Sequence, residues 1–194
     1  MIEAIQLLFS PTRTWEKITR ANRGIAATLL LYLLPLMLFT TGAESYAMVN
    51  WGYQRGQFDQ VVLATREQAI RYGLTQFVLE LAIVIVSAKV IQLIAVAPDR
   101  RQNYTRCFTA VAYGLSPLFL SHLLNCIPAL NTWICFAIGI TLSASALYMA
   151  IPLVLQPDQT KAFGIYLFSI LMLVVLSAFS HWIVVSRLAG GFSF

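Results

Sequence analysis

Five polar side chains interrupt the most apolar stretches of the sequence: Glu44, Glu80, His122, Asn125 and His181. Imidazoles and carboxylates are groups that ligate zinc or relay protons inside membranes. The two histidines and two of the glutamates each stand in a different stretch, and no local motif such as His-Glu-x-x-His accompanies them. The sequence therefore favours no metal site and no catalytic residue at these positions.

Three interpretations of these residues stay open. They form an internal hydrogen-bonded cluster that ties helices together, or a polar site for a translocated solute, or a metal site made by Glu80, His122 and His181. We favour the first, because ligands from separate helices need a preformed fold to meet. Replacing Glu80 by Leu separates the first two interpretations in part, since only a structural cluster would lose folded protein.

The composition identifies the environment of these residues. The chain has 194 residues, of which 59% are hydrophobic and 11% are charged, and its mean hydropathy is +0.74. In soluble domains roughly a quarter of the residues are charged. The low charged fraction of this chain therefore argues against a soluble enzyme, and its high hydrophobic fraction excludes a disordered chain. Three cysteines without a Cys-x-x-Cys pair support neither a disulfide framework nor a zinc ribbon.

Five apolar stretches are long enough to cross a bilayer, which needs about 20 residues per helix. They cover residues 25–44, 74–97, 107–128, 129–155 and 162–186. Backbone groups in lipid must be satisfied within the chain, so each stretch is predicted to be a helix. The predicted fold is an all-α polytopic membrane protein, one domain over residues 1–194. Glu80, His122 and His181 then each lie roughly 9 Å from the same end of the bundle, and Glu44 lies near that end.

The basic residues predict the orientation. With five spans, eight of the Lys and Arg residues fall on one side and four on the other. The first side holds Arg13, Lys17, Arg20, Arg23, Arg100, Arg101, Arg106 and Lys161; the second holds Arg55, Arg66, Arg71 and Arg187. The positive-inside rule places the N-terminus in the cytoplasm and the C-terminus outside.

Two segments outside the spans have helical patterns. Ile2, Ile5, Leu8 and Phe9 form an apolar stripe, and a second short helix follows Ser10-Pro11 with Trp15 beside basic residues. We interpret residues 1–24 as an interfacial helical segment on the cytoplasmic leaflet, although a plain polar lead-in to the first span is the alternative. Residues 46–73 are predicted to be a long outer loop whose second part is an amphipathic helix that leads into the second span.

Two further patterns concern helix packing. Gly139, Ser143, Ala146 and Ala150 form a stripe of small residues in the fourth span. Such stripes let another helix approach closely, and we expect an internal packing seam rather than a dimer face. Tyr113 and Pro117 in the third span are spaced like Tyr148 and Pro152 in the fourth, and each proline is expected to kink its helix.

Two segments resemble a known family. The opening LLFSPTRTWEKI and the run Tyr113-Gly114-Leu115-Ser116-Pro117 are similar to bacterial inner-membrane members of the Yip (Ypt-interacting protein) superfamily, whose third span carries a Tyr-Gly-x-x-Pro signature. The resemblance covers nearly the whole chain and implies five spans in the cell inner (plasma) membrane. Eukaryotic members bind Rab-type GTPases, but their Asp-Leu-Tyr-Gly-Pro motif is not in this sequence, so Rab binding is not carried over.

The resulting functional prediction is a non-enzymatic integral membrane protein that organises lipids or membrane partners and uses no cofactor. Its expected contacts are membrane lipids and either another copy of itself or a different membrane protein, but not nucleic acid. The alternative is a small channel or transporter whose polar site is formed by Glu80 and the neighbouring polar side chains.

Overall fold

The computed structural model describes residues 2–55, 60–95, 104–155 and 159–188, and helices make up nearly all of this part of the chain. The elements are α1 (Ile2–Phe9), α2 (Pro11–Ala21), α3 (Ile25–Thr28), η1 (Leu29–Leu33), α4 (Leu34–Asn50), β1 (Tyr53–Arg55), β2 (Gln60–Val62), α5 (Arg66–Ile94), α6 (Tyr104–Gly114), α7 (Ser116–Ser121), η2 (Leu124–Cys126), α8 (Thr132–Ala150), η3 (Ile151–Leu155) and α9 (Gln159–Leu188).

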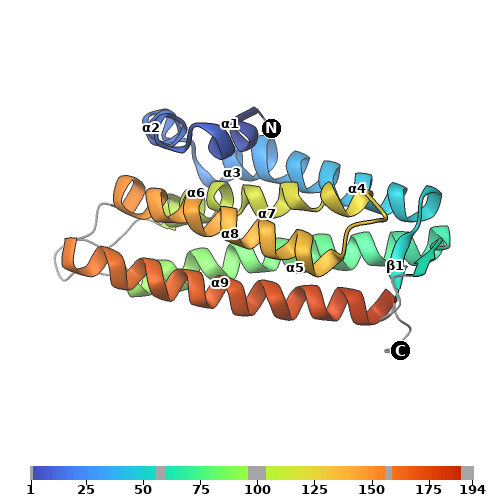
Figure 1. Ribbon diagram of the computed structural model, residues 1–194. Helices are drawn as coiled ribbons and strands as arrows, with labels where there is room; N and C mark the ends of the chain where they lie inside the picture. The colour runs from blue at the N-terminus through green and yellow to red at the C-terminus, as the bar shows by residue number, and fades with distance from the viewer. Residues whose placement is uncertain (1, 56–59, 96–103, 156–158, 189–194) are drawn as a thin grey trace.

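Five helical segments are long and apolar enough to cross a membrane, which confirms the predicted all-α polytopic fold. They are Ile25–Asn50, Arg66–Ile94, Tyr104–Cys126, Thr132–Leu155 and Ala162–Ser186. The segments run back and forth along one axis (Figure 1). We call the end of the bundle that carries β1 and β2 the hairpin end, and the opposite end, where α2 lies, the α2 end.

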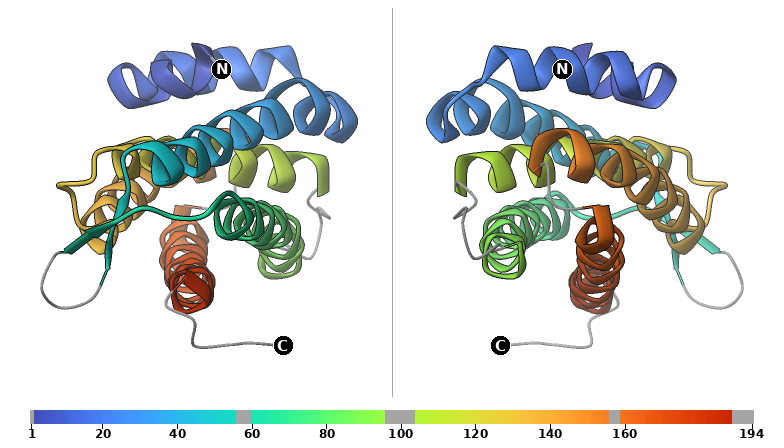
Figure 2. Two further views of the ribbon diagram at one scale, coloured as in Figure 1. Left: turned by 90° about the vertical axis from the view of Figure 1, so that its right-hand side faces the viewer. Right: turned by 90° about the vertical axis from the view of Figure 1, so that its left-hand side faces the viewer.

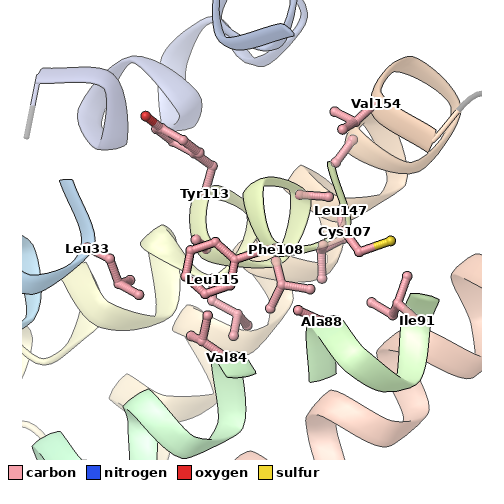
Figure 3. Packing of buried hydrophobic residues seen from close by; sticks show 14 of the residues in the cluster. Leu33, Val84, Ala88, Ile91, Cys107, Phe108, Tyr113, Leu115, Leu147 and Val154 are labelled. Atoms are coloured by element: carbon pink, nitrogen blue, oxygen red, sulfur yellow. The ribbon is translucent and has the colours of Figure 1, made fainter. Parts of the chain in front are cut away.

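The third span forms the centre of the bundle. In its most apolar stretch 83% of the residues are buried inside the protein, against 22–39% in the other spans. The end-on views show α1 and α2 as one outer layer, α5 and α9 as the opposite one, and the third span between them (Figure 2). Its side chains Phe108 and Leu115 pack with Leu33, Val84 and Leu147 from three other spans (Figure 3).

The third span is interrupted at its middle. Helix α6 ends at Gly114, and α7 starts again with Pro117 in its first turn. Proline lacks an N–H and disturbs the helical hydrogen bonds around it. The backbone N–H of Leu118 donates instead to Ser143 Oγ at 3.0 Å. The interruption is therefore bridged by a side chain of α8.

The loop predicted at residues 46–73 is shorter in the structure and covers residues 51–65. Helix α4 continues to Asn50, and α5 already begins at Arg66. Only a short antiparallel hairpin joins them, with Tyr53 opposite Val62. Thr65 caps α5 in a reciprocal capping box with Gln68, so the expected amphipathic helix is the first two turns of the second span.

The third and fourth spans are joined by a tight turn at residues 127–131. The third ends at Cys126, and the fourth begins at Thr132, where the Asn131 side chain caps α8 by accepting from the N–H of Trp133. The three cysteines are free thiols. Two parts of the chain that the prediction places between spans lie outside the described residues, namely residues 98–101 with Arg100 and Arg101, and residues 156–158.

The N-terminal segment forms two helices that pack on the bundle. Ala4, Leu7, Trp15 and Ile18 are buried, whereas Ile2, Ile5 and Phe9 stay exposed. Helix α2 is seen end-on in Figure 1 while the spans run across the view. Helix α1 packs against α7 and α8. The pair thus lies across the α2 end and continues along one side of the bundle.

Candidate functional site

A buried polar cluster lies at the hairpin end of the bundle. Glu44 comes from the second half of α4, His122 follows α7, and Asn125 lies in η2. Helix α5 contributes Tyr72, Gln76 and Glu80, which are spaced by four residues and therefore share one helix face. The cluster joins three of the five spans. We call these six residues the polar cluster.

His122 bridges the two carboxylates of the cluster. Its Nε2 lies 2.7 Å from Glu80 Oε1, and its Nδ1 lies 3.2 Å from Glu44 Oε2. The three side chains are 2–8% exposed, so water contributes little to their solvation. An imidazolium has an N–H donor on each nitrogen, and in that form the ring can donate to both carboxyl groups at once. The cluster therefore places one imidazole between two carboxyl groups.

Glu44 is the most completely hydrogen-bonded member. Its Oε1 accepts from Tyr72 Oη at 2.6 Å and from Asn125 Nδ2 at 2.7 Å. Its Oε2 accepts from Gln76 Nε2 at 3.0 Å, in addition to the contact with His122. Charge-assisted hydrogen bonds of this kind are stronger than those between neutral groups, so Glu44 fastens α4 to α5 and to the end of the third span.

Glu80 is satisfied on one oxygen only. Gln76 Nε2 and His122 both approach Oε1, whereas Oε2 makes no hydrogen bond to another described side chain. Glu80, Gln76 and His122 line a cavity of about 20 Å³, together with Ser177, Ser180 and His181 of α9. A water molecule needs roughly 10–15 Å³ and two to four polar partners, so this cavity suits about one water molecule.

His181 belongs to the cavity wall and not to the hydrogen-bonded cluster. Its ring stacks on Phe136 with centroids 5.0 Å apart and meets Trp133 edge-on at 4.7 Å. Its Nε2 is buried without a hydrogen-bond partner among the described residues. The sequence placed His181 at the right depth, but the fold brings it to the opposite side of a small cavity.

The sequence missed two members of the cluster. Gln76 contacts Glu44, Glu80 and His122, and Tyr72 donates to Glu44. Their signal was the spacing of Tyr72, Gln76 and Glu80 along α5, which puts all three on one face. The predicted loop boundary at residue 73 hid this pattern, because it assigned Tyr72 to an exposed helix outside the span.

The arrangement is not that of a metal centre. Each nitrogen of His122 faces a carboxylate oxygen. The imidazole and the carboxylates therefore point at one another and not at a common point where a metal ion could bind. Among the described residues no group of three His, Cys, Asp or Glu side chains is placed to hold a metal ion. The cluster can hold protons and stabilise charge. Its described side chains do not place a nucleophile next to a general base.

Comparison with family models matches a Yip1 domain over residues 5–181. The chain belongs to the Yip family. The match begins within α1, includes the polar cluster and the first four spans, and ends at His181 in the fifth. Comparison with curated proteins and with solved structures found no match.

The Yip-type signature residues lie away from the polar cluster, in the middle of the third span. Tyr113 stacks on Tyr32 with ring centroids 3.9 Å apart, and its hydroxyl donates to Glu3 Oε2 at 3.2 Å. Gly114 lies against Leu147, where an added Cβ would overlap that side chain. Pro117 is buried in the first turn of α7. These residues set the helix interruption and hold α1.

The small-residue stripe of α8 faces the third span. Gly139, Ser143, Ala146 and Ala150 are all buried. Ser143 accepts the backbone N–H of Leu118, and a Cβ on Gly139 would meet Ser121 and, at 3.1 Å, the Cα of Leu118. In this Yip-family chain the stripe is therefore in contact with α7 within the same molecule.

Proposed function

We propose that this Yip-family membrane protein is non-catalytic and organises lipids or membrane partners through its outer surface. In this proposal the polar cluster is an internal connection between the spans. Its role is to fix the positions of α4, α5 and the third span, so that the outer faces keep one arrangement in the bilayer.

The closed geometry of the polar cluster is the observation that carries the proposal. Both nitrogens of His122 face carboxylates, and Glu44 accepts hydrogen bonds on both oxygens. The neighbouring cavity measures about 20 Å³. A substrate or solute larger than about one water molecule does not fit that volume. This supports a structural role for the cluster over a role in transport or catalysis.

The N-terminal helices support the part of the proposal that concerns lipids. Phe9, Ile5 and Ile2 are 82%, 52% and 72% exposed, and α2 buries Trp15 and Ile18 while it exposes Arg13, Lys17 and Arg20. Exposed apolar side chains beside cations are typical of helices that lie in the lipid interface. We infer that these helices contact lipid at the α2 end.

The distribution of basic residues supports an orientation with the α2 end in the cytoplasm and the hairpin end outside. The N-terminal helices carry Arg13, Lys17, Arg20 and Arg23, and Arg106 lies at the start of α6. Short loops rich in Lys and Arg stay on the cytoplasmic side. The inner (plasma) membrane is the location that we propose, because the chain resembles bacterial inner-membrane members of the Yip superfamily.

A small channel or transporter is the second candidate, and one observation favours it. Glu80 Oε2, Ser177 Oγ and His181 Nε2 are buried polar atoms without a hydrogen bond to a described residue, and all three residues line the cavity. Ionisable groups beside an internal cavity occur along proton and ion pathways. On this reading Glu80 is the group that binds the transported ion.

Proteoliposomes distinguish the two candidates. We expect vesicles containing the protein to lose a proton gradient or a potassium gradient no faster than protein-free vesicles, and Glu80→Gln to leave this rate unchanged. A photo-crosslinker at Phe9 should capture tail-labelled phospholipid, whereas one at Glu67, exposed in a pair with Arg71, should capture little. Gradient loss that requires Glu80 would replace the proposal with the second candidate.

A further inference from the structure

Two surface hollows share Arg23 at the α2 end. The first measures about 260 Å³ and lies between the end of α2 and the start of α6. Its polar lining is Thr19, Asn22, Arg23, Thr105, Arg106 and Thr109. The second measures about 520 Å³ and is lined by Ile2, Glu3, Lys17, Arg23, Leu31 and Tyr32. The polar cluster at the hairpin end contributes no residue to either.

Arg23 is held in place from the bundle side. Its Nη1 lies 3.0 Å from Glu3 Oε2 and 3.1 Å from Tyr113 Oη. Its side chain nevertheless remains 40% exposed. A guanidinium has five N–H donors in a planar fork, so the Nη1 contacts leave donors for a ligand. Glu3 thus fixes the direction of Arg23 without using all of its hydrogen-bonding capacity.

The charges around the hollows favour an anion. The Glu3 carboxylate balances Arg23, which leaves Arg106 in the first hollow and Lys17 in the second as additional cations. The nearby Glu16 carboxylate is paired with Arg20 at 3.7 Å on the exposed side of α2. Two arginines from separate segments that line one hollow suit a phosphate group, because guanidinium forks match its oxygens.

The remaining lining of the first hollow suits a polar headgroup. The Asn22 side chain offers an amide, whereas the Thr19 and Thr109 hydroxyls donate to the carbonyl oxygens of Trp15 and Thr105 in their own helices. These hydroxyls form a polar wall but are not the main anion donors. Specific recognition therefore rests on Arg23 and Arg106.

The position of the hollows selects a lipid over a soluble anion. Arg23 stands two residues before the first span, and Arg106 lies two residues after the start of the third, which is the depth of phospholipid headgroups. The second hollow, which Arg23 also lines, has Ile2 and Leu31 on its wall, and both are more than 70% exposed. Acyl chains fit against such a surface, and a soluble phosphate ester does not need it.

We propose that Arg23 and Arg106 bind the phosphate of an anionic phospholipid whose acyl chains lie along Ile2 and Leu31. The ligand joins α1, α2 and α6, which are otherwise connected at this surface by the contacts of Glu3 and Arg23. This inference rests on the lipid half of the proposed function and names the lipid class and the residues that bind it.

The test uses the full chain in neutral detergent with added phosphatidylglycerol or phosphatidylcholine. Lipid retention by native mass spectrometry and the shift of the thermal midpoint are measured for the parent, for Arg106→Gln and for Arg66→Gln. Arg66 is the matched control, since it also stands in the first turn of a spanning helix but at the hairpin end. We expect about tenfold weaker binding of phosphatidylglycerol by Arg106→Gln, the loss for one charge-assisted contact, and parental binding by Arg66→Gln.

Two results would overturn the inference. One is parental binding of phosphatidylglycerol by Arg106→Gln, and the other is an equal stabilisation of the parent by inorganic phosphate, which would indicate a site for free anions. If Arg106→Gln does not fold, Arg106→Lys replaces it. We then expect phosphatidylglycerol binding that is weaker than in the parent but less than tenfold weaker, because lysine keeps the charge and lacks the planar fork of donors. A negative result in the lipid-binding test does not affect the gradient measurements. Gradient loss that depends on Glu80 would overturn the proposed function and not the lipid site.

Discussion

His122 Nε2 lies 2.7 Å from Glu80 Oε1, and both side chains are no more than 8% exposed. The contact joins the end of α7 to the middle of α5, so it connects the second and third spans near the hairpin end. Truncating one partner of a buried pair leaves the other charge without a partner or solvent, which costs about 3–5 kcal/mol, whereas Gln at position 80 keeps a hydrogen-bond acceptor for His122 and costs less. A pair in this position therefore has a large influence on whether the bundle stays assembled.

The two glutamates of the polar cluster should differ in their tolerance of substitution. Glu44 accepts hydrogen bonds from four side chains, whereas Glu80 has one unbonded oxygen beside the cavity. An amide at position 44 would turn an N–H₂ group toward other donors. We expect Glu44→Gln to lower the free energy of unfolding by about 3 kcal/mol and Glu80→Gln by about 1 kcal/mol.

Unfolding by sodium dodecyl sulfate in mixed micelles, followed by circular dichroism, measures this difference. Asn125→Asp serves as a check on Glu44, because it would place a second carboxylate 2.7 Å from Glu44 Oε1 and should be at least as costly as Glu44→Gln. Equal losses for the two glutamine variants would contradict the assigned hydrogen bonds.

Gly139 and Gly164 offer a matched pair of glycines for testing the packing seam. A Cβ at Gly139 would meet Ser121 and the Leu118 backbone, whereas a Cβ at Gly164 meets nothing within 4 Å. Overpacking costs about 1–3 kcal/mol, so Gly139→Ala should destabilise by that amount. Gly164→Ala should be neutral or stabilising by up to about 1 kcal/mol. Thermal midpoints in detergent measure both, and an unchanged midpoint for Gly139→Ala would show that α7 and α8 do not approach closely.

The spans could be predicted from the sequence because lipid leaves the backbone few choices. A run of apolar residues must become a helix there, and this reasoning identified all five segments. It failed at the ends of the first two spans. Residues 45–50 and 66–73 contain Glu, Gln, Arg and Tyr and lie outside the predicted spans, yet α4 continues, and the Thr65 cap starts the second spanning helix early. Helix ends depend on caps and tertiary burial, which hydropathy does not report.

The candidate site was predictable in depth but not in lateral position. Counting residues from the span ends placed Glu80, His122 and His181 at one level, and Glu80 and His122 are in contact. His181 sits at that level on α9, across the cavity. The arrangement of helices around the bundle axis decides which side chains meet, and no pattern within a single span contains that information. The pairing of Glu3 with Arg23 was missed for the same reason.

Tyr113 should hold the first helix against the bundle through its hydroxyl. The hydroxyl contacts Glu3 and Arg23 at 3.2 and 3.1 Å, and its ring stacks on Tyr32. Tyr113→Phe keeps the ring and removes the hydroxyl, so we expect faster hydrogen exchange at residues 2–9 by about 5–10-fold, the effect of about 1 kcal/mol. Tyr148→Phe, on an exposed tyrosine, is the control. Unchanged exchange in α1 would mean that its apolar contacts alone hold it.

The odd number of spans predicts that the two ends of the chain lie on opposite sides of the membrane. Reporter domains whose activity depends on the compartment, fused at residue 1 and after residue 194, test this directly. We expect a cytoplasmic signal from the N-terminal fusion and an external signal from the C-terminal one. Signals from the same compartment would require an even number of crossings and would invalidate the assigned sides of both ends.

A double-mutant cycle between Glu80 and His122 tests the central claim, that a charge pair fastens the second span to the third. We predict that Glu80→Gln lowers the free energy of unfolding of the parent but raises it in a His122→Leu background, where Glu80 would be a buried charge without its partner. The coupling free energy should be about 1–3 kcal/mol, as for other contacting buried groups. Additive effects, with no coupling beyond experimental error, would contradict the account.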